Sequence, residues 1–129
     1  MRFEKEYGTN EAAVIMDRFI ARYVDRDKIP KRILLWNSLK DGIKTECRPF
    51  SNIMSLDFFD GKTLFVYDER EKVLRQAKWT ELVQFISHLE PWEENIDLLL
   101  FDESLDWFAA VTHEDLLTLC VGTLLSAER

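Results

Sequence analysis

Two hydrophobic runs of strand length, residues 96–101 and 107–111, place the strongest constraint on the fold of this chain. Apart from Asp97, neither run alternates between apolar and polar side chains. Runs of this kind indicate strands that are buried on both faces, as central strands of a sheet are. The five residues between them, 102–106, are mostly acidic or hydroxyl-bearing, which is typical of a turn. The stretch is therefore predicted to be the middle hairpin of a sheet.

The segment after this hairpin is open to two interpretations. Residues 112–115 could turn the chain so that residues 117–121 return as a further strand. The same four residues could instead cap a helix that continues over residues 116–125. The strand is favoured, because several of these side chains suit a pleated surface and Gly122 would weaken a helix interior.

The first part of the chain predicts two helices followed by a strand. Apolar residues at three- and four-residue steps predict an amphipathic helix of about 15 residues, capped by Thr9 or Asn10. A second helix is expected to begin near Pro30 and to end at Gly42, since glycine can adopt a left-handed conformation there. Residues 43–47 alternate between apolar and polar side chains and are expected to form a half-buried strand.

The middle of the chain predicts a hairpin and a third helix. Residues 60–61 are Asp-Gly, a two-residue hairpin turn signal, and they separate the expected strands 53–59 and 62–67. Residues 73–76 are expected to add another short strand. A helix is expected over residues 80–89, capped by the threonine at its start and ended by the proline that follows.

Together these elements predict an α+β fold in one domain, residues 1–129. The expected architecture is an antiparallel sheet of about five to six strands, with two N-terminal helices and one inserted helix packed on one face. Residues 1–7 are either a short edge strand or an extended arm. No apolar run approaches the roughly 18 residues of a membrane span, and the first residues lack a signal-peptide core, so a cytoplasmic location is expected.

Two cysteines, Cys47 and Cys120, lie far apart in the sequence. They form no C-x-x-C motif and have no metal-ligand spacing, so no metal site is expected. A structural disulfide is not expected either, because the chain is expected to be cytosolic. Each is predicted to be a small core residue on a strand, as buried cysteines commonly are.

The net charge of −7 is unevenly distributed along the chain. Residues 1–78 carry 16 basic and 13 acidic residues, whereas residues 79–129 carry 11 acidic residues and one basic residue. A split of this size affects long-range electrostatic fields and partner choice rather than the fold. Nucleic acid and anionic membranes are not expected as partners of the C-terminal half, because it would repel their phosphates.

An acidic cluster flanked by tryptophans is the main functional feature of this half. Its acidic members are Glu90, Glu93, Glu94, Asp97, Asp102, Glu103 and Asp106. Negative charge beside an aromatic anchor suits the capture of a basic protein, because the field steers the encounter and the aromatic ring supplies a desolvated contact. The candidate partner-binding residues are Trp92, Glu93, Glu94, Asp102, Glu103 and Asp106, whereas Trp107 is expected in the core. The alternative is an acidic rim that serves only solubility.

Other chemistry has little support in the sequence. A metal-binding or hydrolytic site could be built from Asp102, His113 and Glu114 if they converged at the strand ends, although their spacing matches no metal motif. No G-x-S-x-G, G-x-G-x-x-G or P-loop motif is present. No catalytic residue, metal or cofactor is therefore predicted, and an enzyme is the less expected class.

The segment 97–107, continued by residues 111–115, combines a strand, an acidic turn, a tryptophan-bearing strand and a Thr-His-Glu turn. It resembles the C-terminal segment of small uncharacterised bacterial proteins, some of which are similar to immunity proteins of polymorphic toxin systems. The resemblance implies a binding role, in which an acidic protein neutralises a cationic toxin domain.

The expected function is thus a non-enzymatic protein-binding module, specifically an immunity-type inhibitor of a basic toxin domain, acting as a monomer or homodimer. One alternative is a small hydrolase or metal-binding domain that uses Asp102, His113 and Glu114. The other is a homo-oligomeric structural protein.

Overall fold

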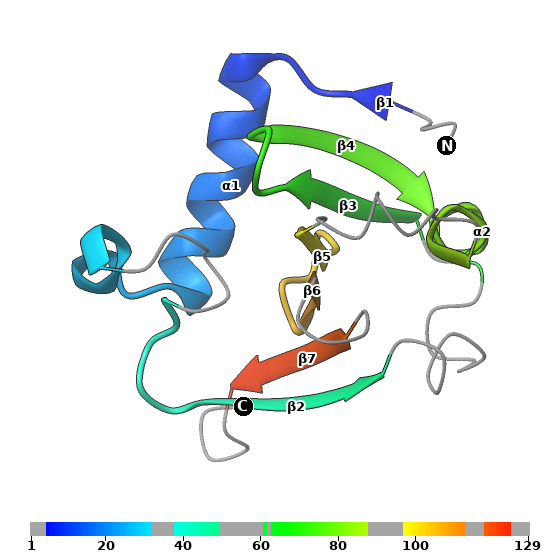
Figure 1. Cartoon of the computed structure of the whole chain (residues 1–129). Helices are drawn as coiled ribbons and strands as arrows, with labels where there is room; N and C mark the ends of the chain where they lie inside the picture. Colours follow the sequence, from blue (N-terminus) through cyan, green and yellow to red (C-terminus); the bar gives the residue numbers. More distant parts are fainter. Residues whose placement is uncertain are drawn as a thin grey trace.

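The fold is α+β, as predicted, and its strands form an antiparallel sheet (Figure 1). The computed structural model describes residues 5–31, 38–49, 61, 63–87, 97–112 and 118–124. Within these residues the strands are β1 (Lys5–Glu6), β2 (Ile43–Pro49), β3 (Thr63–Asp68), β4 (Val73–Lys78), β5 (Leu98–Phe101), β6 (Phe108–Thr112) and β7 (Thr118–Leu124). The helices are α1 (Thr9–Tyr23), the 3-10 helix η1 (Arg26–Lys31) and α2 (Trp79–Ser87).

Strands β5 and β6 lie in the middle of the sheet, which confirms the predicted central hairpin. The order of the seven described strands is β1-β4-β3-β5-β6-β7-β2, and each neighbouring pair is antiparallel. All four residues of β5 are buried. Their side chains divide between two hydrophobic clusters, with Leu98 and Leu100 in one and Leu99 and Phe101 in the other. Alternate residues of a strand point to opposite faces, so both faces of the sheet are covered here.

The two α-helices cover opposite faces of this sheet. Met16 and Phe19 of α1 belong to the same cluster as Leu99, whereas Leu82 of α2 belongs to the same cluster as Leu100. Figure 1 shows α1 and α2 on opposite sides of the central strands. The expectation that the helices pack on one face was therefore wrong. An apolar strand without alternation needs cover on both sides, and one helix on each face provides it.

Helix α1 forms where the apolar stripe predicts it. Met16, Phe19 and Tyr23 are its buried residues, and the Phe19 ring centroid lies 5.0 Å from that of Phe101. The predicted capping residue was wrong by one position, because the helix is preceded by Gly8 and no side chain caps it. The backbone carbonyl of Gly8 accepts the first helical hydrogen bond instead, from Ala12.

The second N-terminal helix does not reach Gly42 as predicted. The described part of this region is the 3-10 helix η1, and residues 32–37 lie outside the described residues. By Leu39 the chain is extended, since that residue forms an isolated antiparallel bridge with Val24. Gly42 does have the expected positive φ, at 95°, and β2 begins directly after it.

Two of the strands predicted for the middle of the chain are present, as β3 and β4, and they pair with each other. Gly61 has a positive φ of 73°, as a turn requires, whereas the expected strand 53–59 lies outside the described residues. Over Phe65–Asp68, β3 pairs with β4 on one side and with β5 on the other. Both edges of these four residues are therefore occupied by strands other than the expected one.

The C-terminal segment is a strand, so the helical alternative over residues 116–125 was wrong. Strand β7 pairs with β6 on one side and with β2 on the other. Strand β2 is thereby the last described strand of the sheet, and β1 lies at the opposite edge, beside β4. Lys5 and Glu6 thus form an edge strand of the described sheet, one of the two possibilities that the sequence left open.

A buried ion pair fixes the start of β5. The side chain of Asp97 is 1% exposed, and its Oδ2 lies 2.7 Å from Nε of Arg70, whose side chain is 46% exposed. The backbone carbonyl of Asp97 also accepts a hydrogen bond from the amide of Glu69, at 3.0 Å. The turn between β3 and β4 is in this way joined to the entry of the central strand.

The two members of this pair should differ in their effect on stability. We expect Arg70→Met to lower the free energy of unfolding by about 3 kcal/mol, because it removes the cation that faces a buried carboxylate. Asp97→Asn should cost only about 1 kcal/mol, since the half-exposed guanidinium can be hydrated. Urea denaturation of both variants measures the difference. Equal costs, or a larger cost for Asp97→Asn, would contradict this account.

Candidate functional site

The turn between β5 and β6 is built around the carboxylate of Asp102. Its Oδ1 accepts hydrogen bonds from the amide and hydroxyl of Ser104, at 2.9 and 2.5 Å. Its Oδ2 accepts one from the indole Nε1 of Trp107, at 3.0 Å. The serine hydroxyl oxygen in turn accepts from the amide of Asp106, at 3.2 Å. Aspartate commonly closes turns in this way, so Asp102 has a structural task here.

Leu105 adopts a left-handed backbone conformation in this turn, with φ 56°. For a residue other than glycine this conformation costs about 1–2 kcal/mol, so it must be held by its surroundings. Its amide donates to the carbonyl of Asp102 at 3.2 Å. Its carbonyl accepts hydrogen bonds from Arg22 Nε, at 3.0 Å, and from the Tyr23 hydroxyl, at 2.5 Å. The last turn of α1 therefore holds the β5–β6 turn in place.

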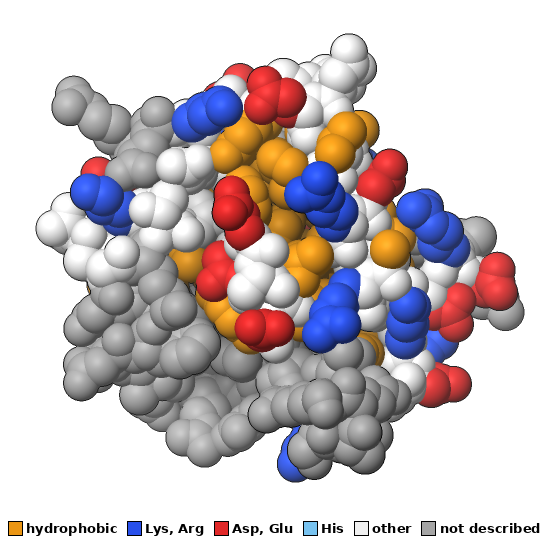
Figure 2. Space-filling view, turned by 180° about the vertical axis from the view of Figure 1, so that it is seen from behind, with side chains coloured by type: hydrophobic (Ala, Val, Ile, Leu, Met, Phe, Trp, Pro, Cys, Tyr) orange, Lys and Arg blue, Asp and Glu red, His pale blue; other side chains and the backbone are white. Residues whose placement is uncertain are grey.

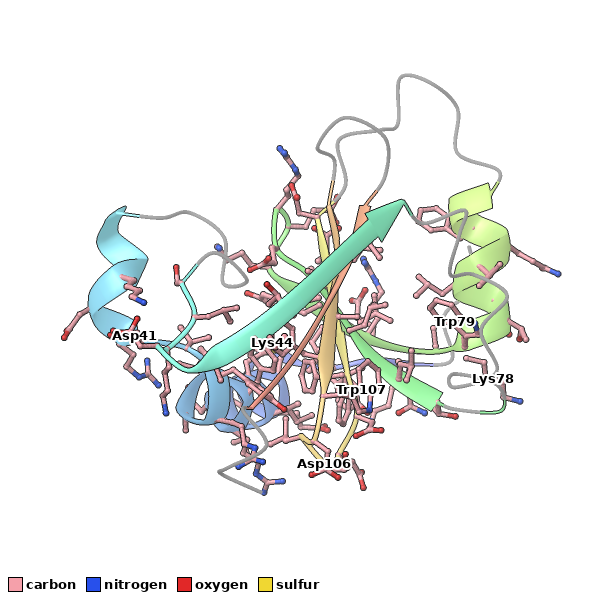
Figure 3. All side chains as sticks on the ribbon, turned by 90° about the horizontal axis from the view of Figure 1, so that it is seen from below. Asp41, Lys44, Lys78, Trp79, Asp106 and Trp107 are labelled. Atoms are coloured by element: carbon pink, nitrogen blue, oxygen red, sulfur yellow. The ribbon has the colours of Figure 1, made fainter. Side chains whose placement is uncertain are left out.

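Glu103 and Asp106 are exposed on this held turn, whereas Asp102 is partly buried. Figure 3 shows Asp106 at the outer edge of the molecule and Trp107 further inside. Within the described residues, no salt bridge involves Glu103 or Asp106. Two of the predicted partner-binding carboxylates are thus brought together and presented to solvent, and the third holds the turn that carries them.

Trp107 belongs to the core, as predicted. It is 6% exposed and packs in the cluster that contains Trp79 and Leu82. Trp92, Glu93 and Glu94, the other predicted partner-binding residues, lie outside the described residues.

Asp97 was wrongly included in the exposed acidic cluster. It is buried against Arg70 and contributes no open carboxylate. Two residues of the alternative metal or hydrolytic site, His113 and Glu114, lie outside the described residues. Its remaining member, Asp102, is engaged by Ser104 and Trp107. In the described part of the chain, no three His, Cys, Asp or Glu side chains come together in a way that could hold a metal ion.

A groove lies beside the turn. Its volume is about 500 Å³, and it is lined by Thr63, Leu64, Phe65, Gln76, Asp102, Glu103 and Ser104. It opens where β5 has ended, because β5 pairs with β3 only as far as Phe65. Figure 2 shows hydrophobic side chains gathered along the middle of the rear face, with a group of acidic side chains on one side and basic side chains on the other. The turn therefore borders a surface that offers both charge and apolar contact.

The phenol of Tyr23 is affected by the same surroundings. Burial raises the pKa of Tyr23, the neighbouring Arg22 acts in the opposite direction, and the charges of Asp106 and Asp102 add to the rise. Sequence reasoning placed Tyr23 in the core but missed its contact with the turn. No local pattern could have indicated it, because the two residues are 82 positions apart.

Comparison with protein-family models, with curated proteins and with solved structures found no match. Neither α-helix in the described part of the chain has the length and hydrophobicity that crossing a membrane would require. Functional conclusions therefore depend on the geometry of the turn and its neighbours.

Removing the Tyr23 hydroxyl should loosen the turn. We expect Tyr23→Phe to lower the free energy of unfolding by about 1 kcal/mol at neutral pH, because one partly buried hydrogen bond is lost. Amide hydrogen exchange of Leu105 should become faster. Tyr7→Phe is the matched control, since it removes a tyrosine hydrogen bond to Gln76 at a different place. Faster exchange of Leu105 in both variants, or in neither, would contradict the proposed anchoring.

Alkaline pH should lower the free energy of unfolding, partly through ionisation of the Tyr23 phenol. The native pKa of Tyr23 is raised, so above the ordinary value of about 10 the unfolded chain loses this proton first and is favoured. The stabilising contribution is complete below pH 10 and is lost as the pH rises through the native pKa. Urea midpoints measured between pH 8 and pH 11 should therefore fall less steeply for Tyr23→Phe than for the wild type. Parallel curves would show that Tyr23 does not titrate in this way.

Proposed function

We propose that this chain is a non-enzymatic protein-binding module that uses the β5–β6 turn to bind a basic protein. The observation that carries the proposal is the presentation of Glu103 and Asp106, two exposed carboxylates on a turn that α1 holds in place. A rigid site loses little conformational entropy on binding, so more of the interaction energy remains available for affinity.

The electrostatics of the C-terminal half support a basic partner. Residues 79–129 carry 11 acidic residues and one basic residue, and the exposed turn lies in this part of the chain. Such a field accelerates the encounter with a cationic surface and discourages anionic partners such as nucleic acid.

The groove beside the turn supplies the apolar contact that such a site needs. Phe65 is partly exposed and lines the same groove as Glu103. Binding energy is commonly concentrated where an apolar contact excludes water next to polar groups. The proposal keeps Trp92, Glu93 and Glu94, which lie outside the described residues, as further candidate contacts, with Trp92 as the aromatic anchor. The proposed partner class is a toxin domain neutralised by an immunity-type inhibitor.

The hydrolase or metal-binding alternative gains no specific observation from the described residues. Asp102 accepts hydrogen bonds through both carboxylate oxygens, and these bonds shape the turn. A general base needs an oxygen that can reach the proton of a substrate or water, and here both oxygens already have donors. Asp102 is therefore assigned a supporting role in the binding site.

A charge reversal at the turn tests the proposal. Glu103→Lys should reduce the association rate with the basic partner about tenfold at low salt, because steering by exposed charges depends on their sign. Glu71→Lys is the control for net charge, since Glu71 is also an exposed glutamate in a turn, between β3 and β4 at the opposite end of the strands. Unlike Glu103, Glu71 forms an ion pair, with Arg75 at 3.9 Å, so the urea midpoint of each variant is measured as well. Immobilised wild-type protein first identifies the partner from host lysate, and interferometry then gives the rates for each variant.

The wild-type association rate should also fall as salt rises, because exposed charges are screened within about 8 Å at physiological ionic strength. Equal effects of Glu103→Lys and Glu71→Lys would point to net charge rather than to this turn. Wild-type rates for Glu103→Lys would refute the proposed site.

A further inference from the structure

The strand register brings the two cysteines of the chain together. Cys47 of β2 lies directly opposite Cys120 of β7 in the antiparallel ladder. Directly opposed residues in such a ladder have Cα atoms about 4.5–5.5 Å apart, and a disulfide bridges Cα atoms about 4.4–6.8 Å apart. A structural disulfide was not expected because the chain was expected to be cytosolic, but the register provides the geometry for one.

The register is supported by a continuous ladder on both sides of Cys120. Strands β2 and β7 are paired along the whole of Ile43–Pro49, so the Cys47 position lies inside the ladder rather than at a frayed end. On the other side, Cys120 lies opposite Ala110 of β6, and Ala110 lies opposite Leu99 of β5. Leu99 and Ala110 belong to the cluster under α1. Residues opposed across neighbouring strands share one face, so both cysteines are placed on the α1 face of the sheet.

We propose that Cys47 and Cys120 form a reversible disulfide that fastens β2 to β7. The oxidant is a small-molecule disulfide of the glutathione class. One cysteine thiolate attacks it, forming a mixed disulfide and releasing one glutathione thiolate, and the second cysteine thiolate then displaces the other glutathione. The protein loses two electrons and two protons, and two molecules of reduced glutathione are produced.

The bond acts on the outermost described strand of the sheet. Strand β7 is the neighbour of β2 in the described sheet, so the bridge ties this edge covalently to the β6–β7 pair. The closed loop contains β3, β4, α2, β5 and β6, and cross-linking a loop of this length strongly restricts the unfolded chain. The oxidised protein is therefore more stable than the reduced protein. This proposal does not depend on the one for the β5–β6 turn.

Thiol–disulfide equilibrium in the native and unfolded chain provides the test. Wild-type protein is refolded into buffers of defined reduced-to-oxidised glutathione ratio, so that both thiols are accessible before folding, and the same ratios are applied in concentrated urea. We expect the equilibrium constant for forming the intramolecular disulfide to be at least about 100-fold larger in the native protein than in urea. A bond that stabilises the native state must, by thermodynamic linkage, form more favourably in the native state than in the unfolded chain. Oxidation should also raise the Tm by about 10 °C.

Single variants and mapping identify the bond. Non-reducing peptide mapping should show one peptide pair that joins Cys47 to Cys120. Cys47→Ser and Cys120→Ser should form no intramolecular disulfide, and oxidised buffer should not raise their Tm. If the native and urea equilibria are equal, or if folding disfavours the bond, the proposal is wrong. Disulfides found only between separate molecules would also overturn it.

Discussion

Burial of β5 on both faces is the constraint on which the rest of the structure depends. The four consecutive residues Leu98–Phe101 are all hydrophobic, so neither face of the strand can be exposed to water at low cost. Helix α1 covers one face and helix α2 covers the other. The buried side chains belong to two separate clusters, and β5 and its neighbour β6 contribute to both. The central hairpin is thereby fixed relative to both helices, which determines where the turn at its end can lie.

The candidate site depends on that core for its geometry. Tyr23 packs with its ring centroid 4.8 Å from that of Phe108, and its hydroxyl reaches the carbonyl of Leu105. One side chain thus joins the aromatic packing under α1 to the left-handed residue of the turn. Sites built on packed elements in this way hold their geometry better than sites on free loops. The exposed carboxylates of Glu103 and Asp106 consequently have a more rigid base than their position in a turn would suggest.

Local patterns in the sequence were sufficient to predict the elements that bury a stripe or an uninterrupted run, such as α1, β5 and β6. They were insufficient where the outcome depends on distant partners. The non-alternating run at 98–101 required cover on both faces, yet it could not indicate that α2 would take the second face. The contact of Arg22 with Leu105 spans 83 positions, and no spacing rule reaches that far.

The acidic bias of the C-terminal half along the sequence does not correspond to an exposed charge at every described residue. Asp97 meets Arg70 in the folded protein, so part of the charge separation seen along the sequence is cancelled in space. The carboxylates of the β5–β6 turn differ in their surroundings. Asp102 accepts hydrogen bonds within the turn, whereas Glu103 and Asp106 are exposed. Charge counts alone could not separate these roles, since each depends on what lies opposite in the fold.

The strand order has a consequence for how the protein is made. Strands β1 and β2 follow one another in the sequence but lie at opposite ends of the described sheet, and β2 pairs with β7, which comes last in the sequence among the described strands. During synthesis the ribosome releases the N-terminal end first. Residues 43–49 therefore cannot pair with β7 until residues 118–124 have been synthesised, so the β2–β7 ladder cannot form before that point.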